Sequence, residues 1–435
     1  MYRKTRLRCG NWYDYTICPN VLGRNMCRKA KAWLAFLALS VIIVERLCFC
    51  TVQLQTAHER TEGLMKLQKL GEGIIYGSAA PKKGDRSSYM PYFCEMDDGT
   101  ILAATSIGSC FDAPDSKTNI LRSTDGGNTF GEFAGAPFDF SDEAYPADGS
   151  MKVTNAGGNH VIAIGYGFVR NHGDLGPANV ETNGLLDCPA FFAESFDGGK
   201  TFTKCRRVNT AWGPHAEASA PLTILANGDY VTPIAAMQDW EGNFTAPMCG
   251  RLLRSTDQGK TWNDDTVIMD FGPDTTVWEQ RLAVTDSGKL VDIAWVENLK
   301  TGELHNNQIA ISTDNGKTFG PAIDTGVHGQ ASGICALGGE RVLTLHSMRR
   351  HVERYGVLAC IVNLENGKWE VESSEYVWEP QFAMTQTTGN LGVFAMLRFG
   401  QPSAVKLSDG TILYTQWLME NDVCRTIWQR FRLVD

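Results

Sequence analysis

The sequence predicts an all-β fold, a six-bladed β-propeller of four-stranded antiparallel blades, and two repeating patterns carry this prediction. The first pattern is an alternating apolar run, a glycine turn and a second apolar run, which occurs six times along the 435 residues. The second is a Ser-x-Asp-x-Gly-x-Thr-aromatic turn that follows most copies of the first. A four-stranded unit repeated radially is typical of a propeller.

Each copy of the first pattern reads as a β-hairpin. Its turn pairs, such as Asp-Gly, Asn-Gly, Gly-Gly and Ser-Gly, supply the positive φ that a tight hairpin turn needs. Consecutive turn glycines are separated by 59, 70, 60, 51 and 71 residues. This spacing predicts six units, whose turn glycines are Gly99, Gly158, Gly228, Gly288, Gly339 and Gly410.

The second pattern begins at Ser123, Ser195, Ser255 and Ser312, with a degenerate copy at Asn363. Its aspartate can accept hydrogen bonds from backbone N–H groups of its own turn, the serine does so more weakly, and the glycine supplies a left-handed conformation. The terminal Phe or Trp is expected to fill the space between two blades. We interpret these turns as structural and expect none of them to contact a ligand.

The two patterns interlock into blades. From a hairpin glycine to the next turn aspartate (Glu365 in the degenerate copy) the distance is 26, 39, 29, 26 and 26 residues. The sixth unit ends after its third strand, "CRTIWQRFRLV", and a three-stranded blade leaves an open edge. We expect the segment "GIIYGS" near residue 75 to fill this place, so that an N-terminal strand closes the ring.

The charge distribution argues against nucleic acid and against an anionic membrane as the main partner. The net charge is −9, and residues 1–64 hold ten Lys/Arg and four Asp/Glu, so the remainder carries −15. A body this acidic repels polyanions. No spacing of cysteines or histidines indicates a metal site, and no phosphate-binding loop is present, so we expect neither a metal nor a cofactor. A structural Ca²⁺ held by loop carboxylates stays open as an alternative.

Residues 1–64 form a basic, cysteine-rich extension that differs from the repeat domain at 65–435. Their apolar segment, residues 32–44, is shorter than the roughly 20 residues that span a bilayer. It is either a signal or signal anchor, which implies a secreted or membrane-anchored protein, or part of a mis-called start upstream of Met65, which implies a cytoplasmic one. A structured extension is the third alternative. Any membrane contact is expected through this segment, and the oligomeric state stays open.

The repeated Asp-bearing turns in a six-bladed propeller resemble the BNR or Asp-box repeats of the sialidase (neuraminidase) superfamily, over about residues 70–435. The resemblance implies a carbohydrate site over the central channel, at the starts of the innermost strands. It also implies three arginines that clamp a substrate carboxylate, a tyrosine nucleophile activated by a glutamate, and an aspartate as acid/base.

Several positions depart from the site that this resemblance implies. Tyr89 in "SYMPYF" and Trp295 in "KLVDIAW" stand where the first two arginines are expected, and Arg354 matches the third. Gln401 in "FGQPSAV" replaces the tyrosine and cannot act as a nucleophile. The usual route of sialic acid hydrolysis is therefore not implied.

Carboxylates are retained at the expected channel mouth. Glu279 matches the superfamily glutamate, and Asp112 matches the acid/base, with Asp115 as its alternate. The other strand heads expected to face the channel carry Asp148, Glu217, Arg281 and His328. Nearby loops add Arg170, His172, His215, Asp239, Trp240, Arg349, Arg350, His351 and Arg398. Arg86, three residues before Tyr89, stays open as a substitute for the first arginine. The alternative for Glu279 is a structural ion pair with Arg281.

Two classes of function follow from these residues. The first is a glycoside hydrolase that pairs Glu279 with Glu217 or Asp112, one as proton donor and the other as base or nucleophile. The second is a carbohydrate-binding or scaffolding propeller without catalysis. A sialidase with a rearranged site stays as a further alternative. Several carboxylates beside aromatic rings suit a neutral or cationic sugar, whose identity the sequence leaves open.

Overall fold

The computed structural model describes residues 65–132, 136–173, 175–179, 181–245, 247–382, 384 and 397–435. Met65–Asp435 make up one compact unit. The expectations for residues 1–64, including the apolar segment at 32–44, lie outside the described residues. Within the described part, no helix is long and apolar enough to cross a membrane.

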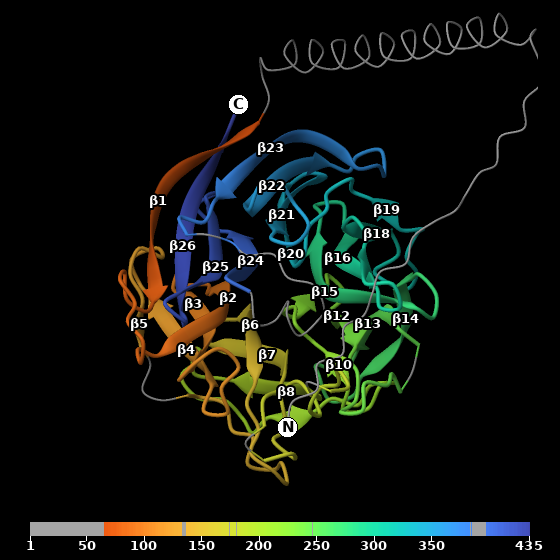
Figure 1. The fold of residues 1–435 in the computed structure, drawn as a ribbon. Helices are drawn as coiled ribbons and strands as arrows, with labels where there is room; N and C mark the ends of the chain where they lie inside the picture. Colours follow the sequence, from red (N-terminus) through yellow and green to blue (C-terminus); the bar gives the residue numbers. More distant parts are fainter. Residues whose placement is uncertain are drawn as a thin grey trace, which may run out of the picture. The chain divides into compact units, whose positions relative to one another are not determined.

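The described residues form 26 strands in six antiparallel sheets, which stand around a ring as the six blades of a β-propeller (Figure 1). This architecture confirms the fold predicted from the two repeats. Blade 1 contains β2 (Ser87–Glu95), β3 (Ile101–Gly108), β4 (Lys117–Ser123) and β5 (Gly131–Glu132). Blade 2 contains β6 (Ser150–Gly157), β7 (His160–Tyr166), β8 (Ala190–Ser195) and β9 (Arg206–Arg207).

Blades 3 and 4 each carry one additional short strand. Blade 3 contains β10 (Ala216–Glu217), β12 (Tyr230–Ala236), β13 (Cys249–Ser255) and β14 (Asn263–Asp270), and β11 (Thr223–Ile224) pairs with β12. Blade 4 contains β15 (Thr275–Val284), β16 (Leu290–Asn298), β18 (Gln308–Ser312) and β19 (Ile323–Asp324), and β17 (Glu303–Leu304) pairs with β16.

The last two blades complete the ring. Blade 5 contains β20 (Ser332–Gly338), β21 (Arg341–Met348), β22 (Gly356–Asn363) and β23 (Glu370–Trp378). Blade 6 contains β24 (Phe399–Lys406), β25 (Ile412–Glu420), β26 (Val423–Val434) and β1 (Lys66–Tyr76). In every blade the first strand of the hairpin is innermost, so the six hairpin starts surround the channel.

The N-terminal strand closes blade 6, as we predicted because the sixth unit of the sequence ends after its third strand. Figure 1 shows β1 beside β26, the two ends of the described chain, and they pair antiparallel from Lys66 with Val434 to Tyr76 with Thr426. The strand extends further than the expected segment near residue 75, because its first half is polar and escapes an apolar pattern. The Leu67 N–H also donates to Glu375 of blade 5 at 3.0 Å, so β1 contacts two blades.

The predicted turn chemistry is present in both repeats. All six hairpin glycines have φ between 58° and 87°. In the turn at Ser195, the Asp197 carboxylate accepts the N–H groups of Lys200 and Thr201 at 3.0 Å, and the serine hydroxyl accepts that of Gly199 at 2.9 Å. The same contacts of Asp and Ser recur in the other three intact turns, at Asp125, Asp257 and Asp314.

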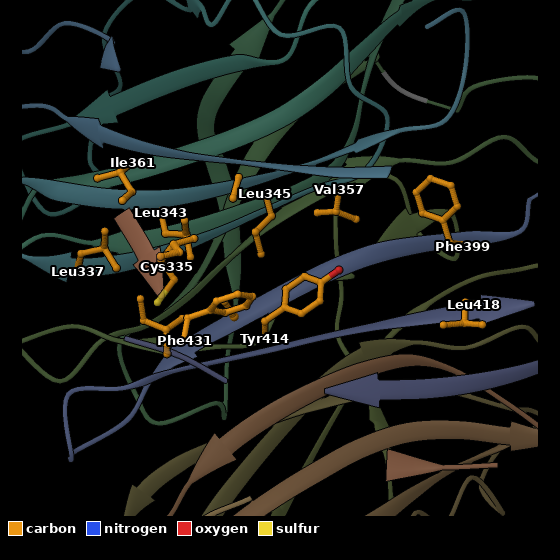
Figure 2. Close-up of a cluster of buried hydrophobic side chains, with 14 residues drawn as sticks. Cys335, Leu337, Leu343, Leu345, Val357, Ile361, Phe399, Tyr414, Leu418 and Phe431 are labelled. Atoms are coloured by element: carbon orange, nitrogen blue, oxygen red, sulfur yellow. The ribbon is translucent and has the colours of Figure 1, made fainter. Parts of the chain in front are cut away.

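Apolar side chains join neighbouring blades. Figure 2 shows such a cluster between blades 5 and 6, where Cys335, Leu343 and Leu345 face Phe399 and Tyr414. The aromatic residue that ends each intact turn is partly buried in the corresponding cluster between its own blade and the preceding one, namely Phe130, Phe202, Trp262 and Phe319. Of the eight described cysteines, all free thiols, seven are buried.

A glycine in β1 provides a test of the ring closure. A Cβ atom at Gly73 would lie 2.6 Å from the Trp428 indole nitrogen of β26. We expect Gly73→Ala to lower the free energy of unfolding by about 1–3 kcal/mol, because the rigid indole must move. Chemical denaturation of the full chain measures this change. Gly71→Ala is the matched control, since its Cβ would make an ordinary 3.5 Å contact with the same ring. Equal stabilities of the two variants would contradict the described packing.

A second test concerns the Asp-bearing turns. Removal of the Asp197 carboxylate leaves two backbone N–H groups without their acceptor, so Asp197→Ala should cost on the order of 1–3 kcal/mol at pH 7. Burial acts to raise the pKa of Asp197, but hydrogen bonds from Thr201 and Ser195 outweigh it and lower the pKa to about 2. The stabilisation is therefore present above about pH 4 and is lost as the pH falls toward 2. A difference from wild type that stays constant over this range would argue against the carboxylate as its source.

Candidate functional site

A cavity of about 450 Å³ lies where the six blades converge. Every blade contributes to its wall, which only a position on the propeller axis permits. The wall is mostly apolar and aromatic, with a few charged groups, which is typical of a ligand site. No residue of the four intact Asp-bearing turns lines it. The blade residues of the wall include Met90, Phe111, Asp112, Tyr166, Phe168, Glu217, Met237, Trp278, Glu279, Trp295, Glu297, Gln330, Arg349, Arg350, Gln401 and Trp417.

β-Bulges on three innermost strands direct side chains into this cavity. The register shifts between Tyr89 and Tyr92 in β2, between Trp278 and Arg281 in β15, and between Gly400 and Ser403 in β24. Inside these bulges lie Met90, Glu279 and Gln401, all of them at the cavity wall, with φ of 54°, 45° and 49°.

A left-handed conformation is unfavourable for residues other than glycine, and such positions cluster at functional sites. A bulge also re-aims the side chain that it carries. The sequence held a signal for two of the three bulges, because Pro91 and Pro402 follow the bulged residues and proline in a strand marks a bulge or an edge.

Glu279 stands at the centre of a hydrogen-bonded chain between blades 4 and 6. Its two carboxylate oxygens accept hydrogen bonds from Trp295 Nε1 at 2.8 Å and from Gln401 Nε2 at 2.6 Å. Trp417 Nε1 donates to Gln401 Oε1 at 3.2 Å. Because an indole can only donate, this contact fixes the Gln401 amide with its NH₂ group toward Glu279. Two residues predicted for the site, Trp295 and Gln401, thus hold the predicted glutamate.

Glu217 supports the same bulge from blade 3. It is only 4% exposed, and its carboxylate accepts the backbone N–H of Glu279 at 3.0 Å. Burial, and next the charge of Glu279, raise the pKa of Glu217 to about 7. Glu217 therefore combines a contact that fixes Glu279 with a titration near neutral pH.

Asp112 is a further carboxyl group of the cavity and follows β3 in blade 1. Burial, and next the charge of Asp148, raise the pKa of Asp112 to about 7. Asp148 is itself buried and forms an ion pair with Arg170, which also donates to the Asp112 backbone carbonyl. The Asp112 carboxyl group makes no hydrogen bond to any residue that the structure describes, so it is available to a ligand.

Aromatic rings form much of the wall between these carboxyl groups. Phe111 lies 4.7 Å from the ring of Tyr89 and 5.0 Å from that of Trp417, measured between centroids. Tyr89 is 2% exposed and donates its hydroxyl to Ser116, so it supports Phe111 from behind the wall. Trp278 stacks on Trp295 at 5.7 Å. Sequence reasoning did not identify Phe111, Trp278 or Trp417, which come together only in the folded ring.

The arginines at the wall are engaged by protein partners. Arg349 donates to Gln330 Oε1 at 2.9 Å and to the Phe399 carbonyl at 2.6 Å, and Arg350 forms an ion pair with Glu297 at 3.1 Å. Burial lowers the pKa of Arg349 to about 10. These two guanidinium groups are therefore poorly placed to clamp a substrate carboxylate.

Several other residues predicted for the site lie outside this wall, among them Arg354, His328 and Arg281. Arg354 is exposed, pairs with Glu379 at 2.8 Å and lies over the ring of Tyr376. His328 is not part of the wall, and burial lowers its pKa. Arg281 lies in an adjoining pocket and donates to Ser219 and to a backbone carbonyl, so it does not form the alternative ion pair with Glu279.

The alternate acid, Asp115, also lies outside the wall and pairs with Arg86. Among the described residues, no group of three or more His, Cys, Asp and Glu side chains could hold a metal ion.

The sequence matches no protein-family model and no curated protein. In structure, the chain is similar to a protein of unknown function from Dyadobacter fermentans, with 17% identity and a TM-score of 0.65 over 85% of this chain and 99% of that one. It is also similar to the intramolecular trans-sialidase from Ruminococcus gnavus, solved in complex with oseltamivir carboxylate, with 14% identity and a TM-score of 0.55 over 84% and 98% of the two chains.

Trypanosoma rangeli sialidase is a further structural neighbour, with 14% identity and a TM-score of 0.53. The alignment covers 84% of this chain and 59% of that one, so this chain spans less than two thirds of that sialidase. Together with the six blades, these similarities show that the fold is a sialidase-like six-bladed propeller.

The raised pKa of Asp112 makes the pH dependence of stability a test of this site. The folded protein favours the protonated carboxyl group, so the contribution of Asp112 to stability is complete below its ordinary pKa of 3.8 and is lost as the pH rises toward 7. Asp112→Asn cannot ionise. We therefore expect the melting temperature of the variant to rise relative to wild type between pH 4 and pH 7. Parallel curves would contradict the burial of a titrating carboxyl group at this position.

Asp115→Asn is the matched control, because Asp115 lies three residues from Asp112 and its pKa is shifted in the opposite direction. A backbone hydrogen bond from Ser109 lowers the pKa of Asp115, although burial opposes it. The control should therefore lose stability relative to wild type as the pH rises toward about 4, and its curve should then run parallel to that of wild type up to pH 7.

Proposed function

We propose that this propeller is a glycoside hydrolase that uses paired carboxyl groups, with Asp112 as proton donor and Glu279 as base or nucleophile. One observation carries the proposal. Asp112, Glu217 and Glu279 come from three different blades and meet in one cavity among aromatic rings. Such a convergence of acids, in which the pKa values of Asp112 and Glu217 are raised to about 7, is typical of acid–base sites.

Asp112 suits the role of proton donor. With a pKa of about 7, a substantial fraction of the carboxyl group keeps its proton at neutral pH, and this proton can pass to the leaving glycosidic oxygen. The absence of a hydrogen bond to described residues leaves the group free to meet that oxygen. Glu217 is the alternative donor, but its contact with the Glu279 backbone favours a positioning role.

Glu279 suits the role of base or nucleophile. Its bulge directs the carboxylate into the cavity, and Trp295 and Gln401 hold both oxygens as acceptors. With Gln401 in place of a tyrosine, no neighbouring nucleophile remains for Glu279 to activate. The carboxylate therefore acts on water or on the anomeric carbon directly, and the anomeric form of the product distinguishes these routes.

The charge of the wall supports a neutral or cationic glycan. Sugar rings stack on indole and phenyl faces such as those of Trp278 and Phe111, and hydroxyl groups donate to carboxylates. Arg349 and Arg350 are held by protein partners, which leaves little to balance an acidic substrate. Trypanosoma rangeli sialidase has been solved in complex with sialic acid, and this supports a carbohydrate ligand for the shared fold.

A panel of aryl glycosides of neutral, cationic and acidic sugars tests the proposal on the full chain. We expect Glu279→Gln, which keeps the shape of the side chain, to lower turnover at least about 10²-fold on the substrate found, with a nearly unchanged melting temperature. Glu303→Gln, at an exposed position of β17 in blade 4, is the control and should retain activity. Full activity of Glu279→Gln would remove Glu279 from the chemistry. Binding of a sugar without hydrolysis would favour the non-catalytic alternative.

A further inference from the structure

The connection between β7 and β8 of blade 2 is unusually long. From hairpin glycine to turn aspartate, blade 2 uses 39 residues, whereas the other units use 26 to 29. Within this connection Ala178 forms an antiparallel bridge with Leu185, and the Leu186 N–H donates to the Pro177 carbonyl at 3.0 Å. These two segments, residues 177–179 and 183–186, are the insertion hairpin. Pro177, Ala178 and Leu185 belong to the wall of the central cavity.

The insertion hairpin is fixed to blade 3. The Leu185 N–H donates to the Asp239 carbonyl at 3.1 Å, and the Asn179 side-chain amide donates to the Trp240 carbonyl at 3.1 Å. These contacts hold the hairpin in place without a ligand. It is therefore a pre-formed part of the cavity wall, and such a wall binds a ligand at a lower entropic cost than a mobile one.

Charged and apolar side chains occupy different arcs of the cavity wall. Blades 3, 4 and 5 form a charged arc, whose charged residues are Glu217, Glu279, Glu297, Arg349 and Arg350. Blades 6, 1 and 2, which follow one another around the ring (Figure 1), form an apolar arc. Besides the insertion hairpin, its apolar side chains include Met90, Phe111, Phe168, Leu397, Trp417 and Met419. In the part of the chain that the structure describes, Asp112 is the single charged side chain of the apolar arc.

We propose that the apolar arc binds the aglycone of the substrate, and that this aglycone is an aryl or alkyl group and not a second sugar. The inference rests on the proposed function, because an acid that protonates the glycosidic oxygen must lie beside the leaving group. With Asp112 as that acid, the leaving group lies on the apolar arc and the sugar lies on the charged arc near Glu279. Arg170, at the start of the long connection, donates to the Asp112 carbonyl at 3.4 Å and so links the acid to this wall.

The apolar arc suits such a group better than a sugar. A second sugar ring carries several hydroxyl groups, which lose their hydration in the cavity and need new partners. The side-chain amides of this arc are Gln401, which Glu279 and Trp417 already engage, and Asn183. A methionine such as Met419 adapts to apolar groups of different shapes. The volume of about 450 Å³ accommodates a drug-sized ligand, which leaves room beside one sugar ring.

Alkyl glycosides of increasing chain length test the inference on the full chain. Methyl, butyl and hexyl glycosides of neutral and cationic sugars, in both anomeric forms, are compared with disaccharides in which glucose replaces the alkyl group. Calorimetry with Glu279→Gln measures binding without consuming the probe. We expect the dissociation constant to fall about two- to fourfold for each added methylene, because each one leaves water for an apolar wall. The disaccharides should bind no more tightly than the methyl glycosides.

Binding and turnover together separate this inference from the proposed function. A chain-length dependence without release of the alcohol by the wild type would contradict the hydrolase and support an apolar subsite. Hydrolysis with dissociation constants independent of chain length would overturn the inference and leave the hydrolase in place. Tighter binding of a disaccharide than of the hexyl glycoside, or no binding of any hexyl glycoside, would also overturn it.

Variants on the apolar arc locate the effect. Met419→Gln keeps the length of the side chain and should remove most of the preference for hexyl over methyl glycosides, with a nearly unchanged melting temperature. Met248→Gln, at a partly buried position before β13 and outside the wall, is the matched control and should keep the preference. Ala178→Asp, in the insertion hairpin, should weaken binding of the hexyl glycoside at least about tenfold and that of the methyl glycoside little. An unchanged preference in both Met419→Gln and Ala178→Asp would contradict the inference.

Discussion

The pairing of β1 with β26 is the constraint on which the rest of the structure depends. Each blade packs only against its two neighbours through clusters such as the one around Tyr414 and Phe399. Without β1, strand β26 is unpaired and blade 6 has an open edge. The packing of blade 6 against blades 5 and 1 is then incomplete. Because all six blades contribute to the central cavity, its geometry depends on a strand at the outside of the ring.

The centre of the ring is built from contacts between blades 4 and 6. The bulges of β15 and β24 bring Glu279 and Gln401 together, and an indole from the second strand of each blade donates to them. In this symmetric arrangement an amide orients a carboxylate, at the positions where the resemblance to sialidases implies a tyrosine and a glutamate. Similarity in fold therefore carries little information about chemistry here, and the side chains of the wall decide it.

The sequence predicted the fold well, because turns such as that of Asp197 are formed by adjacent residues and leave a local pattern. It also predicted Asp112, Glu217 and Glu279 for the site, and the structure places all three at the wall of one cavity. Glu217 and Glu279 were expected at strand heads, whereas Asp112 rests on the resemblance to sialidases. The aromatic wall was not predictable, since Phe111 and Trp417 meet across blades 1 and 6. A bulge also shifts the side-chain alternation by one residue, which no periodicity reveals. This shift brings Met90 to the cavity where Tyr89 was expected.

The closure by β1 has a consequence for synthesis of the chain. Glu72 and its contact Gln429 are 357 residues apart, so the first described strand emerges from the ribosome long before its partner exists. Until then, its edge and that of the growing array of blades are both exposed to wrong partners. Such non-local pairing slows folding. Charged residues such as Lys66, Lys69 and Glu72 make the first half of β1 polar, and charges on an unpaired edge strand oppose aggregation.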